Sequence, residues 1–220
     1  MLPRRNLIVG SAALAASTVA HRPVSGMTMP RPGLLRFDVL RNDSRIGEHV
    51  VRLSRSGAKV EAEVAVELAV RIGPITVFRY THSVREEWRD GEFQWMESRT
   101  NDDGSRHHVR AERTAEGVSV RRANGEVAHL PSGTIPLTHW NRQCMRAPLF
   151  NPQTGLPLKL TVQPRTPETL DLGGGRVART RRYSLVGEAA MDTWYDDADS
   201  WVALQSAGRD GSTISYRWSV

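Results

Sequence analysis

The stretch KVEAEVAVELAVRI, residues 59–72, alternates apolar and polar side chains along its whole length. Every second residue from Val60 onward is valine, alanine, leucine or isoleucine, whereas Glu61, Glu63 and Glu67 occupy intervening positions. Because successive side chains of a β-strand point to opposite faces, this period predicts one long strand with an apolar face and a wet face. Such a strand needs neighbouring strands and a cover for its apolar face before the chain can fold.

The run that follows Gly73-Pro74 repeats the same pattern. Its apolar register contains Tyr80, Val84 and Trp88, and His82 shares that register. We therefore predict that Tyr80, His82 and Trp88 lie on the same apolar face and contribute to a ligand-binding surface there.

Turn sequences separate further alternating runs. Asp-Gly or Asn-Gly pairs lie within RDGE (89–92), DDGS (102–105), ANGE (123–126) and RDGS (209–212). These pairs accept the positive φ angles that tight β-hairpins require. The sequence thus predicts an all-β fold, a single antiparallel meander curved into a barrel or half-barrel, with one β domain over residues 34–220.

One region, residues 135–150, lacks this alternation and contains PLTHWNRQC at 136–144. We expect a short helix or an irregular plug here, lying across the mouth of the barrel. Trp140 supplies the largest apolar surface in the segment and is expected to be its anchor. His139 and Asn141 are expected to hold the segment by hydrogen bonds, and all three are predicted ligand-binding residues.

The same segment suggests an alternative, catalytic role. His139, Asn141 and Cys144 are the residue types of a thiol nucleophile, its base and an orienting amide. Such groups normally come from distant parts of a chain, so we favour a buried, unreactive Cys144. A small hydrolase that uses His139 with Cys144 or an aspartate remains the alternative, and Asp192, Asp196 and Asp197 with Tyr195 could serve as acid or base.

Charge and metal-ligand spacing argue against several other classes. The net charge is +6, but arginines between residues 85 and 113 alternate with glutamates such as Glu86, Glu87 and Glu97, which predicts a mixed solvated surface and no nucleic-acid partner.

Adjacent His107 and His108 would point to opposite faces of a strand, so they cannot bind one metal ion together. A zinc site would need His82, His108 or His139 to converge with a carboxylate, so the sequence indicates no metal and no other cofactor.

The amino terminus, MLPRRNLIVGSAALAASTVA, predicts export. It combines a charged start, an apolar middle over residues 7–16, and small residues Thr18 and Ala20 at the spacing of a cleavage site. We assign residues 1–20 to a signal peptide and residues 21–33 to a flexible leader. Arg4-Arg5 resembles the twin-arginine export signature, with an ordinary positively charged start as the alternative. The apolar run is too short for a stable membrane span, and the expected location is the periplasm.

Several distinctive strings resemble a family of exported proteobacterial proteins known as domain of unknown function 6134. They are RFDVLRNDSRIGEHVVRL, IGPITVFRYTHSVREEW, LPSGTIPLTHWN, NPQTG, MDTWYDDADSWVALQ and RDGSTISYRW. The opening and late hairpins also look like those of domain of unknown function 3108. Both families are similar in outline to periplasmic lipoprotein carriers, which implies an unclosed barrel with an apolar cavity.

These observations favour a non-catalytic periplasmic protein that binds or carries an apolar or amphipathic small molecule or lipid. The first alternative is the small exported hydrolase described above. The second is an accessory protein that docks on an envelope complex. The sequence gives no prediction of oligomeric state.

Overall fold

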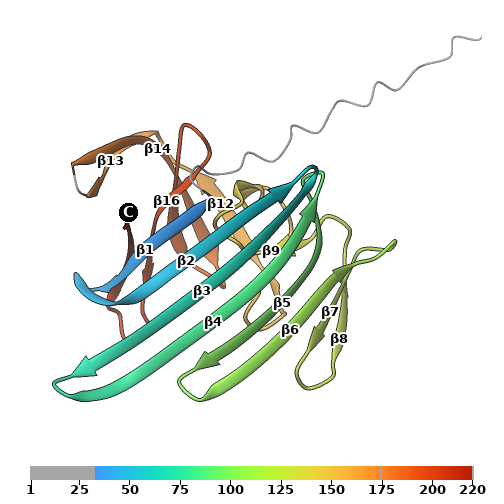
Figure 1. Ribbon diagram of the computed structural model, residues 1–220, viewed down its shortest axis with the longest axis horizontal. Helices are drawn as coiled ribbons and strands as arrows, with labels where there is room; N and C mark the ends of the chain where they lie inside the picture. The colour runs from blue at the N-terminus through green and yellow to red at the C-terminus, as the bar shows by residue number, and fades with distance from the viewer. Residues whose placement is uncertain (1–32, 174, 220) are drawn as a thin grey trace, which may run out of the picture.

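The computed structural model describes residues 33–173 and 175–219, and these form a strongly curved β-sheet (Figure 1). The expected signal peptide, residues 1–20, and all of the expected leader except Gly33 lie outside the described residues. The elements are β1 (Leu34–Arg41), β2 (Ser44–Ser56), β3 (Lys59–Ile72), β4 (Ile75–Arg89), β5 (Glu92–Asp102), β6 (Ser105–Arg113), β7 (Val118–Arg122), β8 (Val127–Leu130), β9 (Ile135–Pro136), the 3-10 helix η1 (Arg142–Met145), β10 (Leu149–Phe150), β11 (Pro157–Leu158), β12 (Leu160–Pro164), β13 (Glu168–Gly173), β14 (Arg176–Gly187), β15 (Met191–Asp196), β16 (Trp201–Ala207) and β17 (Thr213–Trp218).

Within the described residues the main sheet contains 14 strands, in the order β12-β14-β15-β16-β17-β1-β2-β3-β4-β5-β6-β7-β8, with β13 paired to β14. All its pairings are antiparallel, as the predicted meander requires. One pairing was not predicted from the sequence. Strand β17 returns to pair with β1, which places Trp218 opposite Phe37. The chain therefore joins its first and last strands in the middle of the sheet.

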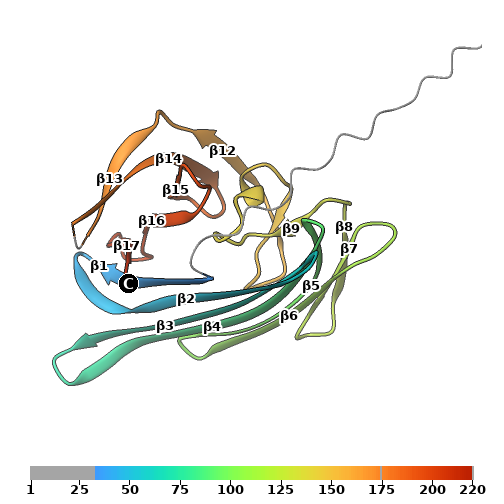
Figure 2. The same ribbon diagram turned by 45° about the horizontal axis from the view of Figure 1, so that its top comes forward.

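The sheet curves without closing. At one end β8 pairs with β7, and at the other β12 and β13 both pair with β14. Figure 2 shows the two arms of the sheet, β1–β8 and β12–β17, facing each other across the interior. The half-barrel prediction is confirmed, and the closed form is not observed.

The predicted two-face pattern of β3 is confirmed over residues 60–67, whereas Ile72 at the end of the strand is exposed. Val60, Ala62, Val64 and Val66 are buried, whereas Glu61, Glu63 and Glu67 are exposed. Two of the predicted turns are confirmed. Both residues of Asp90-Gly91 and of Asp103-Gly104 have positive φ angles, and these turns join the paired strands β4 and β5, and β5 and β6. Local turn chemistry and burial of one face thus specify the same register.

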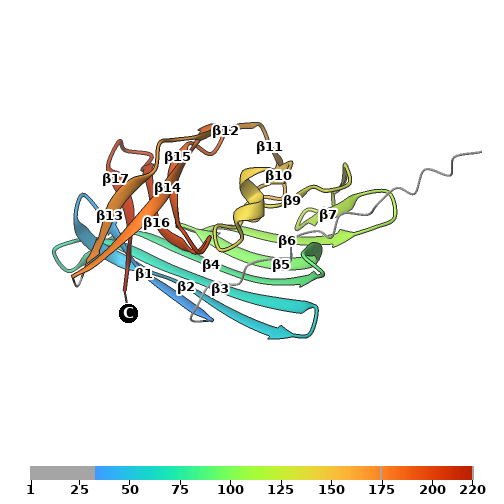
Figure 3. The same cartoon turned by 90° about the horizontal axis from the view of Figure 1, so that it is seen from above.

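The segment between β8 and β12 covers the open side of the interior (Figure 3). It contains η1 and a small sheet in the order β11-β10-β9, which includes the parallel pair β9 and β10. The expected short helix is thus present at residues 142–145. Trp140 is 1% exposed and meets Trp88 edge to face, with ring centroids 5.7 Å apart, so it anchors the segment as predicted.

Among the described residues, no helix has the length and apolar character needed to cross a membrane.

Candidate functional site

A cavity of about 300 Å³ lies between the inner face of the sheet and the covering segment. Its floor comes from β2, β3 and β4, and its opposite walls come from residues 137–140 and 151–153 and from Trp201 and Tyr216. Val64, Val66 and Val84 make part of the floor apolar. This volume is at the lower end of the range for small-molecule sites in proteins.

Three histidines line the cavity: His49, His82 and His139. The strand register places Val66 directly between His49 of β2 and His82 of β4, so the three side chains form one row across the floor. His139 reaches the cavity from the covering segment. The site is therefore assembled from two strands of the sheet and one distant irregular segment.

Trp201 contacts both His49 and His139. The ring of His49 meets it edge to face, and that of His139 stacks on it with an interplanar angle of 30°. Both centroid distances are 5.1 Å. Trp201 is fully buried, so its ring fixes the positions of the two imidazoles that contact it.

Two of the three imidazoles have a nitrogen without a protein partner. Nδ1 of His82 lies 2.8 Å from the hydroxyl of Thr100, whereas Nδ1 of His49 and Nδ1 of His139 are buried and make no hydrogen bond within the described part of the chain. Buried polar atoms are normally hydrogen-bonded, and leaving one unpaired costs about 1–3 kcal/mol. These two nitrogens therefore have unmet hydrogen-bonding capacity, and both belong to residues that line the cavity.

The imidazoles are uncharged at neutral pH. Burial lowers the pKa of His49 to about 3 and the pKa values of His82 and His139 to about 4. For His49 the neighbouring imidazoles of His139 and His82 lower the pKa further. A neutral imidazole has one donor and one acceptor, so the site offers both kinds of hydrogen bond without a fixed charge.

Glu86 also lines the cavity, and the prediction that it belongs to a solvated surface is wrong. It is 3% exposed, because it occupies the inward register between Val84 and Trp88. Its Oε2 accepts a hydrogen bond of 2.8 Å from Nε1 of Trp88. Burial raises the pKa of Glu86 to about 7, and the nearby polar hydrogens of Trp88, Thr138 and Trp140 only partly oppose this effect. Nε1 of Trp140 faces the carboxyl group without forming a well-aligned hydrogen bond.

We expect the protein to lose stability as the pH falls from about 6.5 to about 4. The folded-state pKa values of the three cavity histidines lie below the ordinary value of 6.5, so the unfolded chain binds protons first in this window. Glu86 has a raised pKa and opposes the trend, because its contribution to stability falls as the pH rises from 4.5 to about 7. As the pH falls, the stability lost through the three imidazoles exceeds the stability gained through the one carboxyl group, so the net free energy of unfolding decreases.

Urea unfolding at several pH values measures this effect. His49→Gln removes one titrating group, so its stability should depend less steeply on pH than that of the natural chain. His129→Gln is the control, because His129 is exposed on β8 and its side chain is in water in both states. Equal slopes for the natural chain and His49→Gln would contradict the assignment.

Four of the predicted ligand-binding residues line the cavity, namely Tyr80, His82, His139 and Trp140. The other two lie beside it. Trp88 is fully buried behind Trp140, and Asn141 uses its Oδ1 to accept a hydrogen bond of 3.0 Å from the backbone N–H of Gln143. Asn141 therefore holds the segment as expected, by capping η1.

The expectation that the His139 side chain holds the segment by hydrogen bonds is wrong. Its Nδ1 has no hydrogen-bond partner among the described residues, and its ring instead stacks on Trp201. The backbone carbonyl of His139 forms the attachment, since it accepts a hydrogen bond of 3.0 Å from the hydroxyl of Tyr195. The imidazole is thereby left facing the cavity.

Cys144 lacks the surroundings of a nucleophile. It is fully buried, its Sγ lies 2.9 Å from the carbonyl oxygen of Thr138, and burial raises the pKa of its thiol to about 12. Its other polar neighbour is the hydroxyl of Tyr195 at 3.8 Å. No hydrogen bond joins His139 to Cys144 in the described structure, so the geometry supports the buried, unreactive interpretation.

The aspartates proposed as alternative partners of His139 have local roles. Asp196 accepts hydrogen bonds from the backbone N–H groups of Ala198 and Ser200, at 2.9 and 2.8 Å, and so shapes the turn before β16. Asp192 accepts one of 2.5 Å from the hydroxyl of Ser184 on the neighbouring strand. These contacts explain both residues without catalysis.

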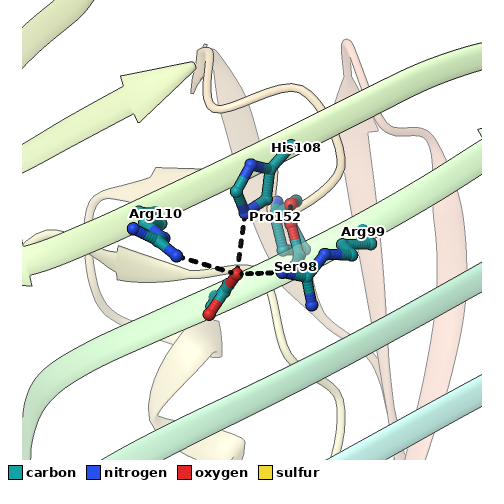
Figure 4. Close-up of polar contacts among 6 residues, drawn as sticks. Ser98, Arg99, His108, Arg110 and Pro152 are labelled. Atoms are coloured by element: carbon teal, nitrogen blue, oxygen red, sulfur yellow. Dashed lines mark hydrogen bonds and ion pairs between the residues drawn. The ribbon is translucent and has the colours of Figure 1, made fainter. Parts of the chain in front are cut away.

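A second hollow, of about 530 Å³, crosses β3–β6 and has exposed Glu67, Arg99 and Arg106 in its wall. The charged side chains next to this hollow are paired with one another by hydrogen bonds. Figure 4 shows three bonds converging on one carboxylate oxygen, Oε1 of Glu97, from Arg99 at 2.7 Å, His108 at 2.8 Å and Arg110 at 3.4 Å. The bond from His108 is the main cause of the lowered pKa of Glu97. We therefore place the candidate site in the smaller, interior cavity.

The histidines named for a possible zinc site do not meet. His82 and His139 line the interior cavity, whereas His108 bonds to Glu97 on the outer face. In residues 33–173 and 175–219, no three side chains of histidine, cysteine, aspartate or glutamate are arranged to hold a metal ion.

Sequence reasoning missed His49, Glu86, Trp201 and Tyr216 of the cavity wall. A signal for two of them was present. His49 shares its register with buried Val51 and Leu53, and Glu86 shares its register with Val84 and Trp88. A polar residue in an otherwise apolar register marks an inward position. Trp201 and Tyr216 gave no such signal, because their place depends on how β16 and β17 meet β1.

The fold and the cavity together define an open, β-barrel-like protein with an interior pocket. The chain is similar in fold to a crystal structure described as a beta-barrel-like protein of domain of unknown function DUF1849 from Brucella abortus, with a TM-score of 0.61 and 8% sequence identity, covering 84% of this chain and 94% of that chain. The chain belongs to the DUF6134 family, a domain of unknown function, whose model matches residues 37–219.

This membership confirms the resemblance seen in the sequence. The similar structure belongs to a different uncharacterised family from domain of unknown function 3108, so the likeness to that family stays a prediction. No curated protein matches the chain.

Proposed function

We propose that this protein is a non-catalytic carrier of a small amphipathic molecule, which binds in the interior cavity. The proposal includes a periplasmic location, which rests on the signal-like amino terminus. The single observation that carries the binding role is the pair of buried, unpartnered Nδ1 atoms of His49 and His139, whose rings both contact Trp201. Unpaired buried polar groups are uncommon in proteins, so two of them on residues that line one cavity favour a ligand that pairs with them.

The cavity lining also supports a particular chemistry for the ligand. Among the described residues that line it there is no lysine or arginine, and its imidazoles are neutral at pH 7. An anionic head group would therefore have no cation to pair with, and burying it would be costly. An uncharged head with hydrogen-bonding groups, such as a hydroxyl, carbonyl or amide, matches the two free nitrogens. The valine floor and the aromatic walls suit an apolar body.

The absence of catalysis in this proposal is supported by the buried thiol. Acyl transfer needs a nucleophile that a base can deprotonate within hydrogen-bond reach of a substrate. Cys144 has no exposed surface and bonds to a backbone carbonyl, so it meets neither condition.

Native mass spectrometry of protein purified from its own compartment is the direct test. We expect a bound small molecule that is released on denaturation and whose head group is uncharged at neutral pH. Protein that is free of any bound molecule in repeated preparations, and that binds no uncharged amphiphile, would overturn the proposal.

A cavity-filling variant tests the location. Val66→Phe places a larger side chain between His49 and His82 and should weaken binding of phenylnaphthylamine, an uncharged fluorescent probe, at least about tenfold. Ala65→Phe is the matched control, because Ala65 is the next residue along β3 and points to the outer face. Probe binding that is equal in the two variants, with both still folded, would place the binding site elsewhere.

A further inference from the structure

The end of the β3–β4 hairpin extends beyond both neighbouring strands (Figure 1). Pairing between β2 and β3 stops at Leu68, and pairing between β4 and β5 begins at Tyr80. Beyond these pairings the hairpin continues as a two-stranded ribbon, which is held at its base by hydrogen bonds between the backbone of Arg79 and Asp103. Such a ribbon has little stability of its own in water, so its sequence is informative about what it meets.

The ribbon exposes its largest aliphatic side chains. Ile72 is 69% exposed, Ile75 is 65% exposed and Val77 is 47% exposed. Ile72 and Ile75 face each other across the Gly73-Pro74 turn, and behind them Val70 pairs with Phe78. Exposed projecting ribbons normally carry polar side chains, because a row of apolar groups at a strand edge favours aggregation. Here apolar side chains concentrate at the tip.

Positive charge lies directly behind this tip. Arg71 precedes Ile72, and Arg79 follows Ile75 by four residues, which is about 13 Å along an extended strand. Both arginines are exposed, and neither forms an ion pair with any described residue. The nearby acidic residue, Asp103 of the β5–β6 turn, accepts a hydrogen bond from the backbone N–H of Arg79.

We propose that the tip of the β3–β4 hairpin, residues 71–79, binds the surface of an anionic phospholipid bilayer. Ile72, Ile75 and Val77 enter the boundary between head groups and acyl chains, and Arg71 and Arg79 pair with the phosphates. The unpaired backbone edges of the ribbon remain in the hydrated head-group layer, since hydrocarbon would leave them without partners. This inference is independent of the ligand proposed for the cavity.

The size of the patch favours a lipid surface over a protein partner. A specific protein interface buries about 800 Å² on each side, which three aliphatic side chains at a turn do not supply. A bilayer imposes no such requirement, because shallow insertion of a few side chains adds to electrostatic attraction. The Gly-Pro turn also suits insertion, because proline lacks an N–H group that would lose its water.

A fluorescent label at the tip provides a local test in the full-length chain. Val77→Cys introduces an accessible thiol, whereas Cys144 is fully buried and is not expected to react. The label is the environment-sensitive nitrobenzoxadiazole group. Vesicles of equal parts phosphatidylcholine and phosphatidylglycerol should shift its emission to the blue. The matched control is Ala58→Cys, in the turn at the other end of β3, whose label should not respond.

Two further variants, made in the Val77→Cys background, test the separate contributions. Ile72→Ser with Ile75→Ser should lower the vesicle affinity at least about tenfold, because burial of one aliphatic side chain is worth that much. Arg71→Gln with Arg79→Gln should reduce binding to anionic vesicles and remove its salt dependence.

Three outcomes would overturn the proposal: no response at position 77, an equal response at positions 58 and 77, or a response without vesicles that rises with protein concentration. The last would indicate contact with a second copy of the chain. Thermal unfolding of each variant shows that the fold is retained.

Discussion

Replacing Trp140 with alanine is expected to lower the free energy of unfolding by about 3–5 kcal/mol, the usual cost of removing a fully buried aromatic side chain. Trp140 is 1% exposed and packs edge to face on Trp88. This contact joins the covering segment to β4. Its loss should also widen the cavity, so phenylnaphthylamine should bind the variant more readily if the variant stays folded.

Urea unfolding measures the first effect and probe fluorescence the second. Trp95→Ala is a matched control, because Trp95 lies on the outer face of β5, where its Nε1 donates to Glu87 over 3.2 Å and its ring is only partly buried. Trp95→Ala should lower the free energy of unfolding by at most about 1–2 kcal/mol. A Trp140→Ala protein as stable as Trp95→Ala would show that the covering segment does not depend on its tryptophan.

Val60→Asp is expected to destabilise the protein by about 3 kcal/mol or more. Val60 is 3% exposed and lies directly opposite Trp88 in the register of β3 and β4. An aspartate there would place an unpaired carboxylate among apolar side chains, which is one of the few changes with so large a cost. The deficit should shrink in acid, where the new carboxyl group is neutral.

Glu61→Gln changes the adjacent residue on the other face of the strand. Glu61 is exposed and forms an ion pair of 2.8 Å with Lys59. Loss of an exposed ion pair costs less than about 1 kcal/mol, so this variant should unfold nearly as the natural chain does. Similar losses from both substitutions would mean that the two faces of β3 are wrongly assigned.

Local features of the sequence predict much of this fold because each acts over a few residues. The alternation in residues 59–72 determines which face of β3 is buried, and Asp-Gly pairs determine where β4 and β6 meet β5. The covering segment was recognisable because it breaks the alternation and contains Trp140. These signals need no knowledge of distant parts of the chain.

The candidate site was less predictable because it depends on long-range pairing. Trp201 reaches His49 only because β17 joins β16 to β1, and no local pattern specifies that connection. Glu86 was misplaced for another reason. The prediction followed the rule that charged residues are usually exposed, although the register of Glu86 with Val84 and Trp88 indicated an inward position. His139 was correctly associated with the interior. However, its backbone carbonyl, and not its side chain, accepts the hydrogen bond that holds the segment, and Nδ1 of its ring has no partner among the described residues.

The pairing of β17 with β1 has a consequence for the order in which the molecule assembles. Strands β1–β8 can form hairpins with their sequence neighbours as soon as they are made, because each pairs with the next. The outer edge of β1 must wait for residues 213–218, which follow all the other described strands in the sequence. Until then that edge can pair with another chain, and folding that depends on so distant a contact is slow. The interval before β17 has been made is therefore a period of aggregation risk for this protein.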